Sequence, residues 1–405
     1  MRNLSNRRVG CSTWSVAAGL AACVILQGCA PIPVAPSDTL LDDIFGAGSG
    51  LRAIDARGEF RRIYCDIYDA RIPAAGDDRT CEDSLRRIPP ESDAISSVPA
   101  GDEIGESFAI LVSPGLGYDC FESLIGDDQE LVRYVEARGH VVRVAATDGL
   151  ADTVQNAAVL RDAVIALDEE SGSRRLLVLS YSKGTNDILE ALVSYPDLAD
   201  RISAVVGVAS AVGGSPLAPE APLWTVNLLA RIPGAECGTP PSGALPSLYP
   251  DVRQKWLAEN TLPESVPYFS IISLPKPDQL ASGLRISYRK LAKIDPHNDG
   301  QVIARDQVIP GSRVLGFVNA DHWAIALPLS RLSAFFGSTF FVRDEFPRDV
   351  LLEAILRYIG TVVPITQLNP SLIQPSQPSK CARNRAVHSA SPPSLTFNRR
   401  RRKSV

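Results

Sequence analysis

The sequence offers few residues of the kinds that bind metal ions. It contains eight cysteines and four histidines among 405 residues, and no two cysteines have the C-x-x-C spacing of a zinc site. No cysteine and histidine stand at a metal-binding spacing either. A zinc centre is therefore not expected, and the scarcity of histidine leaves few candidates for a general base.

A basic surface for nucleic acid is also missing from the body of the chain. Three basic residues precede position 29 and eight follow position 368, in segments that contain no acidic residue. Residues 29–368 keep the other 30 basic residues and all 46 acidic ones, which gives a net charge of about −16. This balance argues against nucleic acid as a partner.

The apolar run at the N-terminus is too short to span a membrane as a helix. It covers residues 14–26, follows three arginines and is succeeded by Gln27-Gly28-Cys29. A short apolar run behind a positively charged start is typical of a secretory signal peptide. We therefore expect residues 1–28 to be a signal peptide.

The stretch Leu26-Gln27-Gly28-Cys29 resembles the lipobox of bacterial lipoproteins, although Gln27 stands where a small residue is usual. The resemblance implies that Cys29 becomes the lipid-bearing N-terminus, with residues 29–50 as a proline-containing tether. It further implies an anchor in the bacterial cell envelope, on the periplasmic side. Ala30, in place of aspartate, resembles lipoproteins sent to the outer membrane. The alternative is ordinary cleavage and secretion.

The cysteines that follow the signal peptide fit an oxidising compartment. Cys65 and Cys81 are close enough in sequence to staple a loop with a disulfide. Cys120 and Cys237 could form a second bridge, which would leave Cys381 as the odd cysteine. These pairings remain alternatives at the level of sequence.

Two segments flank the main domain. Residues 51–105 are expected to be helical, because apolar side chains recur at positions i, i+3, i+4, i+7 and i+8; they are Phe60, Ile63, Tyr64, Ile67 and Tyr68. A second short helix is expected over residues 81–88, giving a helical hairpin. Residues 366–405 are rich in Pro, Ser, Asn and Arg and contain no acidic residue, which predicts a disordered basic tail.

Apolar strands and helical patterns alternate over residues 106–365, without an internal repeat. Strands are expected at 108–112, 141–145, 176–179, 204–208, 268–274 and 314–318, with helices near 124–138, 153–168, 329–336 and 349–359. This alternation predicts an α/β fold with a mostly parallel, doubly wound sheet. Ten prolines between Pro216 and Pro267 interrupt it. Residues 214–266 are therefore expected to be an insertion that caps the carboxyl ends of the strands.

Residues 176–192 are predicted to form a buried strand, a tight turn and a helix that ends at Tyr195-Pro196. Ser182 lies at the turn between the small residues Ser180 and Gly184, the pattern of a nucleophile elbow. Small flanking residues let the strand and helix backbones approach closely. Residues 105–109 also fit the pattern, but their serine, Ser107, precedes an apolar run instead of following one.

A serine nucleophile requires a base within hydrogen-bonding reach. His322 follows the last expected strand and is the preferred candidate, with His297 as the second. His140 begins a strand ahead of the nucleophile and is interpreted as structural, and His388 lies in the tail.

The third member of such a site is an acid that orients the imidazole. Asp299-Gly300-Gln301-Val302 resembles the Asp-Gly-x-Val stretch that carries the acid in many bacterial lipases, and Asp299 lies between Ser182 and His322 in chain order. Asp295, Asp306 and Asp321 compete with it. Asp321 directly precedes His322, a poor geometry for supporting the ring.

With serine, acid and histidine in this order, residues 107–360 resemble an α/β-hydrolase of the serine esterase/lipase kind. The resemblance implies the α/β-hydrolase fold and a carboxylic ester hydrolase with an acyl-enzyme, without metal or cofactor. It places one oxyanion-hole donor, a backbone N–H, on Lys183 and another on residues 113–118, where Leu116 is our candidate. The side chain of Lys183 is unusual, because a helix dipole disfavours a cation in the first turn; Asp187 could partly compensate.

The expected substrate is a small-molecule or lipid ester. An apolar, proline-rich insertion suggests a hydrophobic acyl group. The same triad would also serve an acyltransferase or a peptidase, and a non-catalytic binding lipoprotein on a hydrolase scaffold is a further alternative.

Overall fold

The computed structural model describes residues 37–72, 79–92, 108–118, 134–172, 174–220, 243–326 and 346–363. Several sequence predictions therefore lie outside the described residues. They are the signal peptide, Cys29 and the tether up to residue 36, the possible Cys120–Cys237 bridge, Cys381, Ser107, His388, the helix over 329–336, most of the helix over 124–138 and the basic tail.

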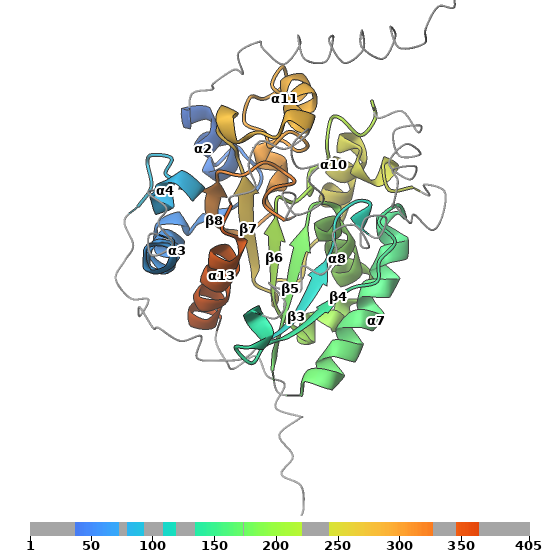
Figure 1. Ribbon diagram of the computed structural model, residues 1–405. Helices are drawn as coiled ribbons and strands as arrows, with labels where there is room; N and C mark the ends of the chain where they lie inside the picture. Colours follow the sequence, from blue (N-terminus) through green and yellow to red (C-terminus); the bar gives the residue numbers. More distant parts are fainter. Residues whose placement is uncertain are drawn as a thin grey trace, which may run out of the picture. The chain divides into compact units, whose positions relative to one another are not determined.

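Strands and helices alternate along the chain (Figure 1). The strands are β1 (Ile54–Asp55), β2 (Leu85–Arg86), β3 (Phe108–Ser113), β4 (Val141–Val144), β5 (Arg175–Tyr181), β6 (Ile202–Val208), β7 (Tyr268–Ser273) and β8 (Arg313–Val318). The α-helices are α2 (Ser37–Phe45), α3 (Arg57–Arg71), α4 (Cys81–Ser84), α7 (Thr153–Ser171), α8 (Lys183–Ser194), α10 (Pro250–Glu259), α11 (Arg285–Leu291) and α13 (Arg348–Val362). Short 3₁₀ helices are η2 (Pro196–Asp200), η3 (Pro246–Leu248), η4 (Pro277–Gln279), η5 (Ser282–Leu284) and η6 (Ala304–Gln307).

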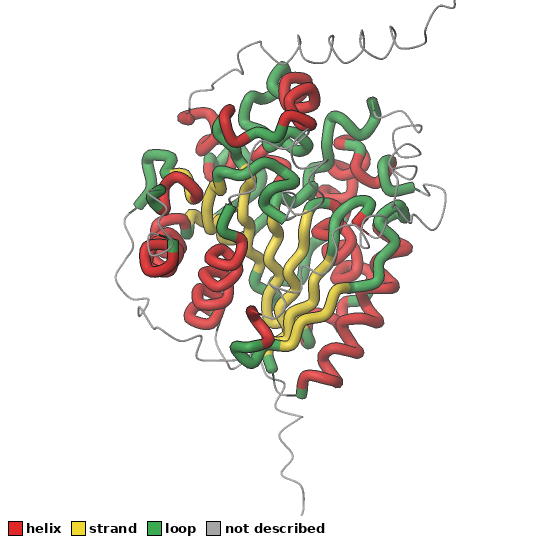
Figure 2. The backbone as a smooth tube through the Cα atoms, in the orientation of Figure 1, coloured by secondary structure: helices red, strands yellow, loops and turns green. Residues whose placement is uncertain are grey.

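The described strands, yellow in Figure 2, form one sheet in the order β1-β8-β7-β6-β5-β3-β4, with β2 also paired to β8. Every pair along this order is parallel, and only β2 runs antiparallel to its neighbour. Parallel strands bring their carboxyl ends to one edge of the sheet, where ligands bind in such folds. The predicted mostly parallel sheet is confirmed.

Helices cover both faces of the sheet, so the central strands are apolar on both sides. In β3, Phe108 and Ile110 belong to the core under α3 and α13, while Ala109 and Leu111 face the core under α7 and α8. Aromatic rings tie the first of these cores together, with the Phe60 ring 6.0 Å from that of Tyr358 in an edge-on arrangement. The doubly wound arrangement is confirmed.

The segment before β3 is more closely joined to the sheet than the sequence suggested. The predicted helix face is confirmed, because the five apolar residues of α3 are all buried. The second helix, however, ends at Ser84 after one turn, and the chain then forms β2, which pairs with β8. The prediction of a helical hairpin is wrong for this reason. Cross-strand pairing with β8 outweighs the weak helical pattern of residues 85–88.

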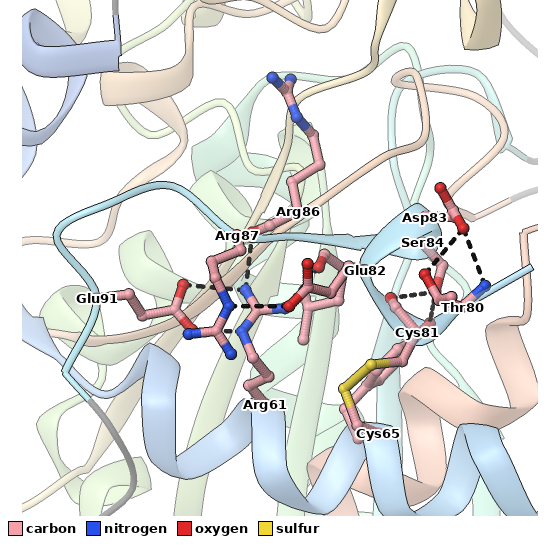
Figure 3. Close-up of a disulfide and its surroundings, with 12 residues drawn as sticks. Arg61, Cys65, Thr80, Cys81, Glu82, Asp83, Ser84, Arg86, Arg87 and Glu91 are labelled. Atoms are coloured by element: carbon pink, nitrogen blue, oxygen red, sulfur yellow. Dashed lines mark hydrogen bonds and ion pairs between the residues drawn. A yellow bond between two sulfur atoms is a disulfide. The ribbon is translucent and has the colours of Figure 1, made fainter.

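A disulfide and the buried Arg61 hold this segment together (Figure 3). Cys65 on α3 and Cys81 on α4 form the expected disulfide, with a Cα–Cα distance of 5.2 Å. Arg61 donates to the backbone carbonyls of Leu85 at 2.6 Å and Arg86 at 2.8 Å, and pairs with Glu91. The guanidinium thus supplies donors to the carbonyls of both residues of β2.

The described parts of the insertion pack beside α8. Trp256 on α10 donates its indole N–H to Glu190 on α8 at 2.6 Å, and Arg253 donates to the carbonyl of Val212 at 3.0 Å. Residues 221–242, the middle of the insertion, lie outside the described residues. No helix in the described ranges is long and apolar enough to cross a membrane.

Candidate active site

Ser182 occupies a strained turn between β5 and α8. Its φ of +52° lies in the left-handed region, which a non-glycine residue adopts only when the surroundings enforce it. Here the N–H of Ser182 donates to Val208 O at 3.2 Å, and its carbonyl accepts from the N–H groups of Thr185 and Ala211 at 3.1 and 3.2 Å. The turn places the serine at the carboxyl end of a central strand, as a nucleophile elbow requires.

Close backbone packing explains the small residues on both sides of Ser182. A Cβ on Gly184 would lie 2.3 Å from the carbonyl oxygens of Ser113 and Pro114, so only glycine fits there. Ser180 is buried beneath the turn and donates to Val206 O at 3.0 Å. The sequence argument from small flanking residues therefore has a direct steric cause.

His322 links the serine to an acid. Its Nε2 is 2.9 Å from Ser182 Oγ, and its Nδ1 is 2.7 Å from Asp299 Oδ2. The backbone N–H of His322 also donates to the carbonyl of Asp299 at 3.1 Å, and Tyr181 donates its hydroxyl to the carbonyl of His322 at 2.6 Å. Three residues that lie far apart in sequence thus form one continuous hydrogen-bonded relay.

Asp299 is fully buried, and hydrogen-bond donors hold its carboxylate. Oδ1 accepts the backbone N–H groups of Gln301 at 2.9 Å and Val302 at 2.7 Å, and Oδ2 accepts from Gln307 Nε2 at 3.2 Å. Gly300 follows with φ +93°, which lets the chain fold back over the carboxylate. The Asp-Gly-x-Val stretch therefore builds its own carboxylate cradle. Sequence reasoning missed Gln307, which stands eight positions later in no recognisable motif.

The other candidate histidines are bound elsewhere. Nδ1 of His140 accepts the backbone N–H of Phe108 at 2.9 Å, and its ring stacks on that of Phe108. Burial lowers the pKa of His140, which fits a neutral structural imidazole. His297 is 3.1 Å from Asp295 through Nδ1. Among the described histidines, His322 is the one that is hydrogen-bonded to Ser182.

The competing acids also have other surroundings. Asp321 accepts the backbone N–H groups of Trp323 and Ala324 on one oxygen, at 3.0 and 2.9 Å, and that of Ala281 on the other, at 2.7 Å. Burial raises the pKa of Asp321 while these amides lower it. Asp306 lies against Gly213, and burial raises its pKa to about 6. Asp321 thus organises the loop that carries His322 instead of contacting its ring.

The loop that carries Leu116 lies against the elbow. A Cβ on Gly115 would come within 2.8 Å of the Tyr181 ring and 3.2 Å of Ser182 Cβ, so the loop backbone touches the serine. Ser113, at the start of this loop, donates its hydroxyl to Gly184 O at 2.9 Å. The first residue of α8 is Lys183, whose N–H has no acceptor within the helix. Both expected oxyanion-hole segments therefore border Ser182.

The described residues contain no group of three His, Cys, Asp or Glu side chains that could hold a metal ion. Chemistry in this cluster is that of a hydroxyl, an imidazole and a carboxylate. A serine hydroxyl in contact with a paired imidazole can attack a carbonyl carbon once its proton is removed.

Solved structures similar to this chain include esterases and lipases. The metagenomic carboxyl esterase MGS0156 is 33% identical to this chain, with a TM-score of 0.68, over 85% of this chain and 98% of the esterase. A lipase of Bacillus licheniformis in its mature form is 19% identical over 64% of this chain and 95% of its own, with a TM-score of 0.47. Lipase 1 of Pelosinus fermentans is 12% identical over 64% of this chain and all of its own, with a TM-score of 0.44.

No protein-family model and no curated protein matches the sequence. The likeness to the metagenomic esterase is enough to assign the family, because it combines 33% identity with nearly the full length of that protein. This chain belongs to the α/β-hydrolase family of carboxyl esterases, enzymes that hydrolyse carboxylic esters.

Proposed function

We propose that this protein hydrolyses carboxylic esters through Ser182, His322 and Asp299, by way of an acyl-enzyme. The relay of 2.9 Å from Ser182 Oγ to His322 and 2.7 Å from His322 to Asp299 carries the proposal. It orders the three groups as nucleophile, base and orienting acid. No other described histidine contacts a serine in the elbow position.

In the first half-reaction, His322 Nε2 takes the proton of Ser182 as Oγ attacks the ester carbonyl. Asp299 holds the Nδ1 proton and stabilises the imidazolium that forms. The negative oxygen of the tetrahedral intermediate is bound by the backbone N–H groups of Lys183 and Leu116. His322 then returns the proton to the leaving alcohol, and Ser182 remains acylated.

In the second half-reaction, water enters beside His322 and is deprotonated by Nε2 as it attacks the acyl carbonyl. The bond between Ser182 and the acyl carbon breaks, and His322 gives its proton back to Ser182 Oγ. The carboxylic acid leaves and the enzyme is restored. The step uses the same oxyanion donors, because the second tetrahedral intermediate occupies the same position.

Substituting Ser182→Ala tests the proposal. Hydrolysis of p-nitrophenyl esters of graded acyl length should vanish, while the circular dichroism and the melting temperature stay near those of the wild type. Ser203→Ala is the matched control, because Ser203 lies near the amino end of β6, away from the elbow. Full activity in Ser182→Ala would contradict the proposal. Labelling of the wild type by a fluorophosphonate, abolished in the variant, would identify the nucleophile directly.

We also propose that Cys29 carries a lipid and anchors the enzyme in the bacterial cell envelope, where small-molecule or lipid esters are its substrates. The lipobox-like stretch that ends at Cys29 supports the anchor. A Cys29→Ser variant should move from the membrane fraction to the soluble fraction without losing esterase activity. Membrane recovery equal to that of the wild type would contradict the anchor and leave the esterase proposal intact.

A further inference from the structure

A buried ion pair adjoins the nucleophile. Lys183, directly after Ser182, places Nζ 2.8 and 2.9 Å from the two carboxylate oxygens of Asp187, one turn along α8. Only 1% of the Lys183 side chain and 2% of that of Asp187 are exposed. Burial raises the pKa of Asp187 to about 6, against the lowering effect of Lys183 and Asn156. A buried pair of this kind adds little stability over an apolar pair of similar size, so stability does not account for it.

Asn156 joins this ion pair to a second helix. Its Nδ2 donates to Asp187 Oδ2 at 2.8 Å and to the backbone carbonyl of Asp148 at 2.9 Å, while its Oδ1 accepts the N–H of Asp148 at 3.1 Å. Asn156 is 1% exposed and lies in the first turn and a half of α7, which runs beside α8 (Figure 1). It therefore fixes the start of α8 to the turn that precedes α7.

That turn supports the loop of the proposed oxyanion hole. The carbonyl of Gly149 accepts the N–H of Gly117 at 3.2 Å, and Gly117 directly follows Leu116. Asp148 closes the turn by accepting the N–H of Leu150 on its side chain at 2.8 Å. A continuous chain of hydrogen bonds and one ion pair thus runs from the residue after the nucleophile to the residue after the second donor.

Arg253 is a further charged group near this network. It lies on α10, is 1% exposed and donates to the carbonyl of Val212. Its positive charge lowers the pKa of Asp187. It touches neither the loop nor the turn through a hydrogen bond among those found in the described residues. Its contribution is electrostatic, whereas Asn156 supplies the mechanical link.

We propose that the Lys183 side chain, Asp187 and Asn156 form a positioning network that holds the backbone N–H groups of Lys183 and Leu116 at a fixed separation. This inference rests on the proposed function, because it assumes that these two amides bind the oxyanion. Each donor must lie within about 2.7–3.1 Å of the developing charge, so a small shift between elbow and loop weakens one of them. The three side chains do not touch substrate; they act through the two amides.

A double substitution separates this role from a structural one. Lys183→Met with Asp187→Leu removes both charges and leaves an apolar pair, which buried sites of this kind tolerate well. We expect an almost unchanged KM for p-nitrophenyl butyrate and a melting temperature only a few degrees below that of the wild type, because Asn156 Nδ2 loses one of its two acceptors. We expect kcat to fall about 10- to 100-fold. Affinity for an aryl trifluoromethyl ketone, which forms the tetrahedral adduct, should fall by a similar factor.

Two further variants and one control complete the design. Asn156→Ala cuts the link between the helices and keeps the ion pair, so kcat and ketone affinity should fall in parallel, by about 3- to 10-fold. Lys183→Arg keeps the charge on a side chain of different shape, so kcat and ketone affinity should both fall, but less than in the double variant. Lys255→Met with Glu259→Leu removes an exposed pair of the same spacing on α10 and should change neither quantity.

The outcomes test the positioning network separately from the proposed esterase function. If the double variant and Asn156→Ala both keep wild-type kcat and ketone affinity while Ser182→Ala is inactive, the positioning network is refuted and the proposed function stands. If the double variant does not fold, Asn156→Ala decides the question by the same two measurements. If Ser182→Ala remains active, the proposed function itself fails.

Discussion

Adding one methyl group at Gly184 should disable the nucleophile elbow. The new Cβ would lie 2.3 Å from the carbonyl oxygens of both Ser113 and Pro114, and contacts of a Cβ below 3.0 Å essentially never occur. Relief therefore needs a displacement of about 0.7 Å. Both obstacles are backbone atoms at the end of β3 and the start of the oxyanion loop, so no side-chain rotation can provide it.

The magnitude follows from two opposed effects. Alanine is favoured over glycine inside a helix by up to about 1 kcal/mol. Overpacking against a rigid neighbour costs about 1–3 kcal/mol, so after the full helix gain Gly184→Ala should still lower the free energy of unfolding by up to about 2 kcal/mol. Because the displaced backbone leads directly to Leu116, kcat should fall further than stability, by up to about 100-fold.

The chain contains a matched control for this change. Gly360 also lies in a helix, α13, and a Cβ there would meet its nearest atoms at 3.8 and 4.0 Å, an ordinary contact. Gly360→Ala should therefore raise the free energy of unfolding by up to about 1 kcal/mol and leave kcat unchanged. Urea unfolding followed by circular dichroism and hydrolysis of p-nitrophenyl butyrate measure both effects. Wild-type stability and kcat in Gly184→Ala would refute the steric reasoning.

Three more outcomes are expected. Gln307→Leu removes the donor to Asp299 and also the side chain that bonds the buried N–H and carbonyl of Ser273 at 2.7 and 3.1 Å. It should lower the free energy of unfolding in urea by about 2–4 kcal/mol and also lower kcat. An unchanged kcat would contradict the role of Gln307 in supporting Asp299. Burial raises the pKa of Asp306 to about 6, above its value in the unfolded chain, so its ionisation destabilises the fold as the pH rises from about 4 to 6. The Asp306→Asn variant should therefore be as stable as the wild type near pH 4 and about 1–2 kcal/mol more stable at pH 8. A stability difference that is the same at both pH values would contradict this reasoning. Replacing Cys65 and Cys81 by serine opens a short loop and should lower the melting temperature by the equivalent of about 2–3 kcal/mol, with kcat retained; a variant as stable as the wild type would show that the contacts of α3 suffice.

Most of the fold could be predicted from the regular spacing of apolar residues in the sequence. The apolar spacing of residues 60–68 identified one face of α3, and the apolar run before Ser182 identified β5, because long buried elements impose a pattern on the sequence. The strands β1 and β2 have two residues each and impose none. They exist because β8 offers backbone groups to pair with, which no local pattern reveals.

Some residues of the candidate site could likewise be predicted from the sequence, and others could not. Ser182 and Asp299 stand in motifs whose local backbone geometry demands particular neighbours, and those neighbours are visible in the sequence. Gln307 and Asn156 act through side chains that reach another element, at 3.2 Å to Asp299 Oδ2 and 2.8 Å to Asp187 Oδ2. Such contacts depend on the tertiary fold alone, so a polar residue in an ordinary helix or turn gave no signal of its role.

The pairing of β1 and β2 with β8 has a consequence for the order in which the chain folds. These strands lie roughly 230 to 260 residues before their partner in sequence, among the longest separations that a fold of this size can contain. The apolar face of α3 rests on β8 and α13 and cannot be covered until both have been synthesised. This early part of the chain therefore cannot complete its packing before β8 is made, and a chain that stops short of β8 would expose that face to solvent.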